Sequence, residues 1–86
     1  MSQTTITVRY FASLREALGA SESLVWQPGM SLGGLRDQLL ARGEPHASAL
    51  SRTRALRCAL NQQIAKEDAL IPEGAEVAFF PPVTGG

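Results

Sequence analysis

Cysteine, histidine and long apolar runs are scarce in this chain, and each scarcity excludes a class of function. Cys58 is the single cysteine, so no disulfide can form within the chain and no thiol cluster can hold zinc. His46 is the single histidine, and one cysteine with one histidine does not make a metal site. No stretch approaches the ~18 apolar residues that cross a membrane. We therefore expect no metal site and no association with a membrane.

Net charge is also lacking, because eight basic and eight acidic side chains cancel. This balance argues against a general nucleic-acid or membrane-surface binder. The charges are distributed unevenly, with a net charge of +3 over residues 1–57 and of −3 over residues 58–86. We therefore expect the end of the chain to be acidic and the partner that receives it to be basic.

Common enzyme motifs are missing as well, since no GxGxxG, GxxxxGK[ST], HExxH or GxSxG pattern occurs. The 86 residues, 44% hydrophobic and 19% charged, have the length and composition of one globular domain. A domain of this size buries only roughly 60–65% of its unfolded surface, which favours a binding or carrier module over an enzyme with a deep pocket. The first ten residues combine no basic region with an apolar run, so we expect no signal peptide and a cytoplasmic location.

Alternating polar and apolar residues predict several short strands. In the third strand, the alternation directs Leu56, Cys58 and Leu60 toward the core, which makes Cys58 a buried, inert thiol. The Asn61-Gln62 pair is typical of a turn, after which a short return begins at Ile64. The other three strands are expected at residues 5–10, 24–26 and 76–80.

Capping residues predict two helices. Ser13 and Glu16 fit a capping box that begins a short helix, which Gly19 can end. Ser31 fits the cap of the main helix, whose leucines repeat at helical spacing until Gly43.

Two segments are harder to assign. Residues 44–54 fit either a short helix or an open loop, and His46 within them is interpreted as a surface histidine. Residues 68–70 fit a single helical turn, in which Glu67 and Asp68 form a helix-start pair rather than an acid–base dyad.

The order of the elements predicts an α+β fold, with one main helix packed on one face of a mixed sheet of four to five strands. This is the β-grasp, or ubiquitin-like, layout. We expect residues 1–80 to form the domain and residues 81–86 to form an extended, flexible tail ending in Gly-Gly.

The last eight residues, FFPPVTGG, indicate where the chemistry takes place. Pro81 and Pro82 end the last strand and stiffen its exit. Gly85 and Gly86 lack side chains and can pass through a narrow channel, so the α-carboxylate is the only reactive group at the tip. A carboxylate needs activation, usually adenylation by ATP on another protein, before acyl chemistry. The alternative is a frayed terminus without a role.

An apolar patch is expected beside the start of this tail. It comprises residues that fall opposite the inward side chains of their strands, namely Phe11, Ala59, Ile64 and Phe80, and its rim would carry Arg9, Arg15 and Arg57. Apolar patches rimmed by charge mark binding surfaces. The alternative is that some of these side chains pack under residues 44–54.

Four segments resemble the small subunit of molybdopterin synthase, the MoaD family: VRYFASLREALG from Val8, LNQ from Leu60, PEGAEV from Pro72, and FFPPVTGG at the end. The resemblance covers nearly the whole chain and is weakest over residues 44–54. One departure is Ala75, where the family often has Asp. The run before the final Gly-Gly is specific, because other β-grasp sulfur carriers usually lack it.

The resemblance implies a sulfur carrier without catalytic side chains of its own. An E1-like adenylyltransferase would use ATP to adenylate Gly86, and a sulfur donor enzyme would convert it to a thiocarboxylate. The sulfur would then pass to cyclic pyranopterin monophosphate and build the dithiolene of molybdopterin. No cofactor would be bound stably, and the chain would offer no metal ligands.

The partner implied by the resemblance is the large synthase subunit, in a heterotetramer. The tail residues that would enter its active site are Pro81, Pro82, Val83, Thr84 and Gly85, and the residues that would bind its surface are Phe11, Arg15, Ala59, Ile64 and Phe80. Three alternatives stay open: a sulfur carrier for thiamine or cysteine synthesis, a ubiquitin-like protein modifier, and a β-grasp adaptor with an idle tail.

Overall fold

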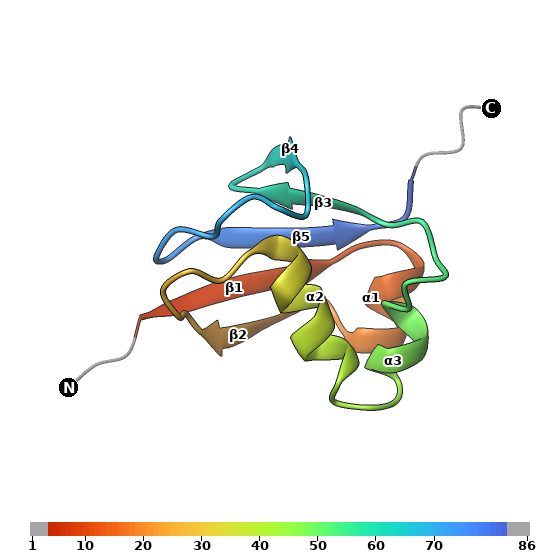
Figure 1. Cartoon of the computed structure of the whole chain (residues 1–86). Coiled ribbons are helices and arrows are strands. Elements are labelled where there is room, and N and C mark those ends of the chain that lie inside the picture. Colours follow the sequence, from red (N-terminus) through yellow and green to blue (C-terminus); the bar gives the residue numbers. More distant parts are fainter. Residues whose placement is uncertain (1–3, 83–86) are drawn as a thin grey trace.

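Five strands and three helices make up residues 4–82, the part of the chain that the computed structural model describes (Figure 1). Helix α2 crosses one face of the sheet, and α1 and α3 lie near the end at which β1 stops. The elements are β1 (Thr5–Tyr10), α1 (Ser13–Leu18), β2 (Ser21–Val25), α2 (Leu32–Leu40), α3 (His46–Ala49), β3 (Arg57–Leu60), β4 (Gln63–Ala65) and β5 (Glu76–Phe80).

The sheet is mixed, with the strand order β2-β1-β5-β3-β4. The central strands β1 and β5 run parallel, in a register that pairs Tyr10 with Phe79, and the other neighbours are antiparallel. Because β1 and β5 run in the same direction, α1 begins at the end of the sheet where Pro81 leaves it. The predicted α+β fold with a mixed sheet is confirmed.

The core lies between α2 and the sheet. Ile6, Val8 and Tyr10 are buried on β1 while the residues between them are exposed, as the alternation predicts. Three leucines of α2 and two inward residues of β5 pack on them, and burial of each such side chain stabilises the fold by roughly 1.5–3 kcal/mol. They are Leu32, Leu35, Leu39, Val77 and Phe79.

The cap predicted for the main helix is confirmed, and the one for the short helix is wrong. The Ser31 hydroxyl accepts a hydrogen bond from the Gly34 amide at 3.0 Å. Helix α1 instead takes Ala12 as its N-cap, at φ 54°, and no side chain caps it. Ser13 is already inside the helix. The Phe11 amide still bonds to the Phe79 carbonyl of the sheet, so the chain turns into the helix at Ala12.

The boundaries of other elements differ from the sequence expectation. Strand β2 begins at Ser21 and ends at Val25, so Trp26 lies outside it and donates its indole N–H to the Ile71 carbonyl at 2.6 Å. The Asn61-Gln62 turn is confirmed, with both residues at positive φ (50° and 70°). A turn with a bridge from Leu70 to Ser31 takes the place of the helical turn expected at residues 68–70.

Candidate functional site

The chain leaves the sheet at Pro81 and Pro82, directly after β5. Proline has no amide hydrogen and a restricted φ, so the ladder of β5 cannot continue through these residues. Both rings are half-buried. The remaining predicted tail residues, Val83, Thr84, Gly85 and Gly86, lie outside the described residues, so the roles assigned to them stay predictions.

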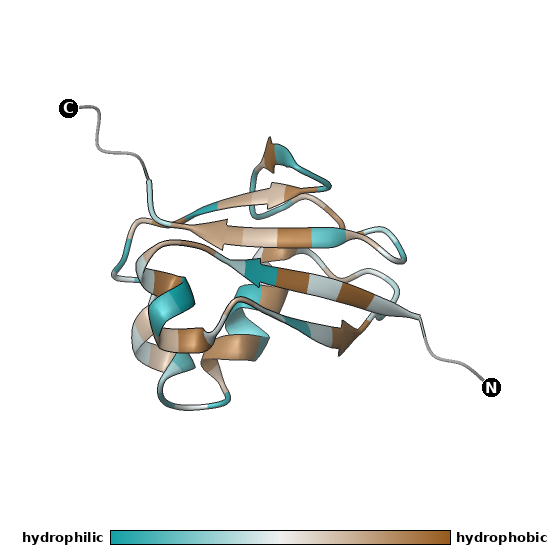
Figure 2. Cartoon of the chain, turned by 180° about the vertical axis from the view of Figure 1, so that it is seen from behind, coloured by the Kyte–Doolittle hydropathy of each residue, from teal (hydrophilic) through white to brown (hydrophobic). Residues whose placement is uncertain are grey.

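The apolar residues predicted to face away from the main helix do come together. We call them, with Ala78, the open-face patch: Phe11, Ala59, Ile64, Ala78 and Phe80. Ala59 has Ile64 and Ala78 as its cross-strand partners, and Phe11 follows the Tyr10–Phe79 pair. Figure 2 views the sheet from the side opposite α2, which lies behind it. Ile64 is 65% exposed and Phe11 38%.

Not every residue predicted for this surface contributes to it equally. Ala59 is only 7% exposed, so it offers little contact area. Arg15 is exposed on α1, at the end of the sheet where the tail begins. Arg9 is bound within the domain, because its guanidinium lies 5.2 Å from the centre of the Phe11 ring and 3.7 Å from the Glu76 carboxylate.

Two of the four acidic residues after residue 57, Glu73 and Glu76, lie away from the start of the tail. Glu76 begins β5, at the opposite end of that strand from Phe80. Glu73 lies in the preceding turn and accepts a hydrogen bond from Thr4, just before β1. Glu67 is paired with two arginines. For Glu73 and Glu76, the expected acidic chain end is therefore not reproduced in space, because the charge was counted along the chain; the basic partner expected from that count stays a prediction.

A groove of about 580 Å³ opens beside the tail exit. Its walls come from the chain that leads into β3 and the start of that strand, from β4 and the two residues after it, and from Pro82, the last described residue. Arg57 and Lys66 contribute exposed cations to it. The sequence offered no signal for this groove, because its walls are separated by up to 27 positions along the chain, from Ala55 to Pro82.

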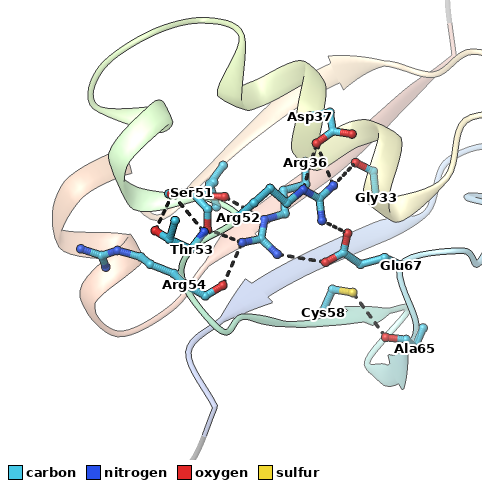
Figure 3. A network of polar contacts seen from close by, with 11 residues as sticks. Gly33, Arg36, Asp37, Ser51, Arg52, Thr53, Arg54, Cys58, Ala65 and Glu67 are labelled. Atoms are coloured by element: carbon cyan, nitrogen blue, oxygen red, sulfur yellow. Dashed lines mark hydrogen bonds and ion pairs between the residues drawn. The ribbon is translucent and has the colours of Figure 1, made fainter.

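A buried arginine, Arg36, bonds to Glu67, a residue of the groove wall (Figure 3). Arg36 is 4% exposed, and its Nη1 bonds to a Glu67 carboxylate oxygen at 2.9 Å. Its other nitrogens donate to backbone carbonyls: Nε to Leu50 at 2.8 Å, and Nη2 to Ser51 at 2.6 Å and to Arg54 at 3.1 Å. The guanidinium thereby joins α2 to the segment leading into β3.

Glu67 lies between two cations, since Arg52 also bonds to it. Hydrogen bonds from Arg52, and then from Arg36, hold the pKa of Glu67 below its ordinary value. The helix-start interpretation of Glu67 is wrong, because the residue holds two arginines and no helix begins there.

Cys58 lines the groove and is buried, as predicted. Its Sγ lies 3.3 Å from the Ala65 carbonyl oxygen, and burial raises the pKa of the thiol. The thiolate form is therefore disfavoured, which makes Cys58 a poor nucleophile.

His46 is not the surface residue that the sequence suggested. Its side chain is 17% exposed, and its Nε2 lies 3.5 Å from a Glu22 carboxylate oxygen. The same carboxylate accepts hydrogen bonds from the Tyr10 hydroxyl at 2.8 Å and from Arg42 at 2.7 Å. Burial and the bond to Glu22 raise the pKa of Tyr10 well above its ordinary value.

Within residues 4–82, no group of three His, Cys, Asp or Glu side chains is placed to hold a metal ion. No helix in this part of the chain is long and apolar enough to span a membrane.

Comparison with known proteins adds a family and a fold. The profile of the ThiS family matches residues 8–86. A curated relative from Escherichia coli (strain K12) is 38% identical over 81 residues, which cover 94% of this chain and 99% of the relative. One from Haemophilus influenzae is 33% identical with the same coverage. Both are named molybdopterin synthase sulfur carrier subunit.

Solved structures confirm the β-grasp expectation. SAMP1 from Haloferax volcanii, a small archaeal modifier protein, has a TM-score of 0.72 at 25% identity and covers 95% of this chain and 99% of its own. A Caldiarchaeum subterraneum ubiquitin has a TM-score of 0.58 at 14% identity, covering 99% and 100%. A Helicobacter pylori structure, a complex of subunits 1 and 2 of molybdopterin-converting factor, has a TM-score of 0.59 at 22% identity, covering 95% and 99%.

Proposed function

The chain belongs to the ThiS family and, within it, to the molybdopterin synthase sulfur carrier subunits, from which we infer that it carries sulfur in molybdenum cofactor biosynthesis. The observation that carries this conclusion is the 38% identity over almost the full length of both chains. The terminal Gly-Gly after FFPPVT agrees with it. The chain is accordingly a subunit of a sulfurtransferase complex.

The proposed chemistry takes place at Gly86. A carboxylate oxygen attacks the α-phosphorus of ATP, pyrophosphate leaves, and an acyl adenylate forms. A sulfur donor enzyme delivers sulfur at the oxidation level of sulfide, which displaces AMP and leaves a thiocarboxylate. Cyclic pyranopterin monophosphate accepts the sulfur, and water restores the carboxylate. The side chains that assist these steps belong to the partner proteins.

The described residues suit this carrier role through their placement. Strand β5 delivers the chain to the end of the sheet, and Pro81 and Pro82 prevent it from pairing further. The open-face patch lies beside that exit and offers a surface to the large synthase subunit, with which we propose a heterotetramer. The Helicobacter pylori structure, which holds subunits 1 and 2 together, supports the large subunit as a partner. The activating enzyme, which uses ATP, and the sulfur donor complete the proposed partners.

The intact mass of the chain tests this proposal. After incubation with ATP, a sulfide source and the cognate activating enzyme, we expect a species heavier by one exchange of oxygen for sulfur, mapped to Gly86. Deletion of Gly86 should abolish sulfur transfer and leave the unfolding transition unchanged, because the buried core is built from residues between Ile6 and Phe79. Full activity of the truncated chain would refute the carrier mechanism.

A protein modifier is the second candidate, because the Haloferax volcanii neighbour is named as one. A modifier would form isopeptide bonds between Gly86 and lysines of other proteins. Conjugates of high mass on a denaturing gel, stable to thiols, would favour this role. A thiocarboxylate without such conjugates would favour the sulfur carrier.

A further inference from the structure

The groove beside the tail exit has no role in the chemistry above. Its volume of about 580 Å³ falls in the range of ~300–1,000 Å³ that is typical of binding pockets. Apolar parts of its wall come from Leu56, Ile64 and Pro82. Because Pro82 is part of the wall, the groove lies next to the point where the tail begins.

The groove is continuous with the open-face patch. Ile64 belongs to both, since it lines the groove and is also the cross-strand partner of Ala59. Its side chain is 65% exposed, which is high for an isoleucine on a strand. A partner that covers the open-face patch therefore also reaches the groove.

The charge in the groove is positive. Arg57 and Lys66 are exposed, and neither forms an ion pair with another residue between 4 and 82. The third charged residue of the wall, Glu67, is already paired with Arg36 and Arg52. Two cations thus remain for a partner at this position, and a second copy of the chain would bring like charges together.

We propose that this groove receives an apolar side chain flanked by carboxylates on the large synthase subunit, and that Arg57 and Lys66 pair with those carboxylates. The proposal rests on the sulfur carrier function. The contact orients the domain while the tail enters the partner, and it selects for a partner surface of acidic character. Paired charges at the rim of such a contact act mainly on the rate of association.

The test compares two double variants of equal charge by their binding to the cognate large subunit. One variant, Arg57→Gln with Lys66→Gln, removes both groove cations. The control, Gln27→Glu with Gln63→Glu, changes the net charge equally at exposed positions outside the groove wall. Association rate and affinity are measured by surface plasmon resonance at about 0.03 M and about 0.5 M salt, which bracket strong and weak screening.

We expect the groove variant to bind roughly tenfold more weakly at low salt, mostly through slower association, and the difference to shrink at high salt. The control should stay within about twofold of the wild type. The single Lys66→Gln variant, outside any strand, keeps the test valid if the double variant does not fold. A third variant, Ile64→Ser, should weaken binding equally at both salt concentrations, because apolar contacts are not screened.

Two other results would overturn the proposal. If the wild type binds the large subunit and the groove variant binds equally well at low salt, the groove is not part of the contact, while the carrier function stands. If the chain self-associates and the groove variant does not, the groove belongs to a second copy. Failure of the wild type to bind the large subunit would instead count against the proposed function itself.

Discussion

Replacement of Arg36 by methionine tests whether the buried guanidinium holds the segment before β3 in place. Methionine keeps most of the apolar length and removes every donor. Arg36 is 4% exposed, and the variant loses three bonds to backbone carbonyls together with one to Glu67. Hydrogen bonds from charged donors contribute about 1.5–3 kcal/mol each, but water can replace those to the accessible residues Ser51 and Arg54.

Leu50 decides the magnitude, because it is fully buried and its carbonyl is left without the Arg36 donor. We expect Arg36→Met to lower the free energy of unfolding by about 3–5 kcal/mol. That is a large part of the ~5–15 kcal/mol that stabilises a typical domain. Urea unfolding, followed by circular dichroism with an unchanged slope, measures the loss.

The matched control is Arg52→Met, which removes the other arginine paired with Glu67. Arg52 is 45% exposed, so its ion pairs contribute only about 0–1 kcal/mol. A loss of stability for Arg36→Met no greater than that for Arg52→Met would refute the argument that burial makes this guanidinium decisive.

Three further changes test the site and its supports. Phe80→Lys should weaken binding to the large subunit severalfold with little change in melting temperature, since Phe80 is half-buried on the open face. The control Val25→Lys places the same charge on another strand at an exposed residue and should leave binding unchanged. A large fall in the melting temperature of Phe80→Lys would instead make Phe80 a core residue. The lowered pKa of Glu67 stabilises the fold above about pH 4.5, and this stabilisation is lost as the pH falls through the lowered folded-state pKa. Below pH 4.5 the urea midpoint of Glu67→Gln should therefore depend less on pH than that of the wild type. An identical pH profile for the two proteins would contradict the pairing. Gly33→Ala should reduce stability in thermal unfolding despite a gain in helix propensity of about 1 kcal/mol, because the added Cβ would lie 3.0 Å from the carboxylate and 3.2 Å from the backbone carbonyl of Glu67. In Gly34→Ala the added Cβ meets only the Ser31 hydroxyl, so this variant should be tolerated better. Equal stability of the two variants would show that the contact with Glu67 is relaxed at no cost.

Strands and their faces were largely predictable, because alternation is a property of neighbouring residues. The prediction of residues 5–10 matches β1, and that of 76–80 matches β5. The same alternation placed Phe11, Ile64 and Phe80 on one face. The helix cap at Ser31 was found for a similar reason, since it involves residues three positions apart.

The failures came from contacts between distant residues. Ser13 fits a capping box locally, but the bond between Phe11 and Phe79 sets the start of α1. Trp26 extends the apolar run of β2, yet its indole bonds to Ile71, 45 positions later. His46 lies in a polar segment, yet the fold carries it to Glu22.

The sequence by itself led to the chemistry proposed for this protein, because that proposal rests on neighbouring residues alone: two glycines, with two prolines shortly before them. Only the tertiary structure decided what surrounds that terminus. Strand β5 runs parallel to β1, which places Glu73 and Glu76 at the end of the sheet opposite Pro81. Arg36 and Arg52 form ion pairs with Glu67. Charge acts through space rather than along the chain, so Pro82, in a segment that is acidic by count, lies in one groove wall with Arg57 and Lys66, which form no ion pair with another residue between 4 and 82.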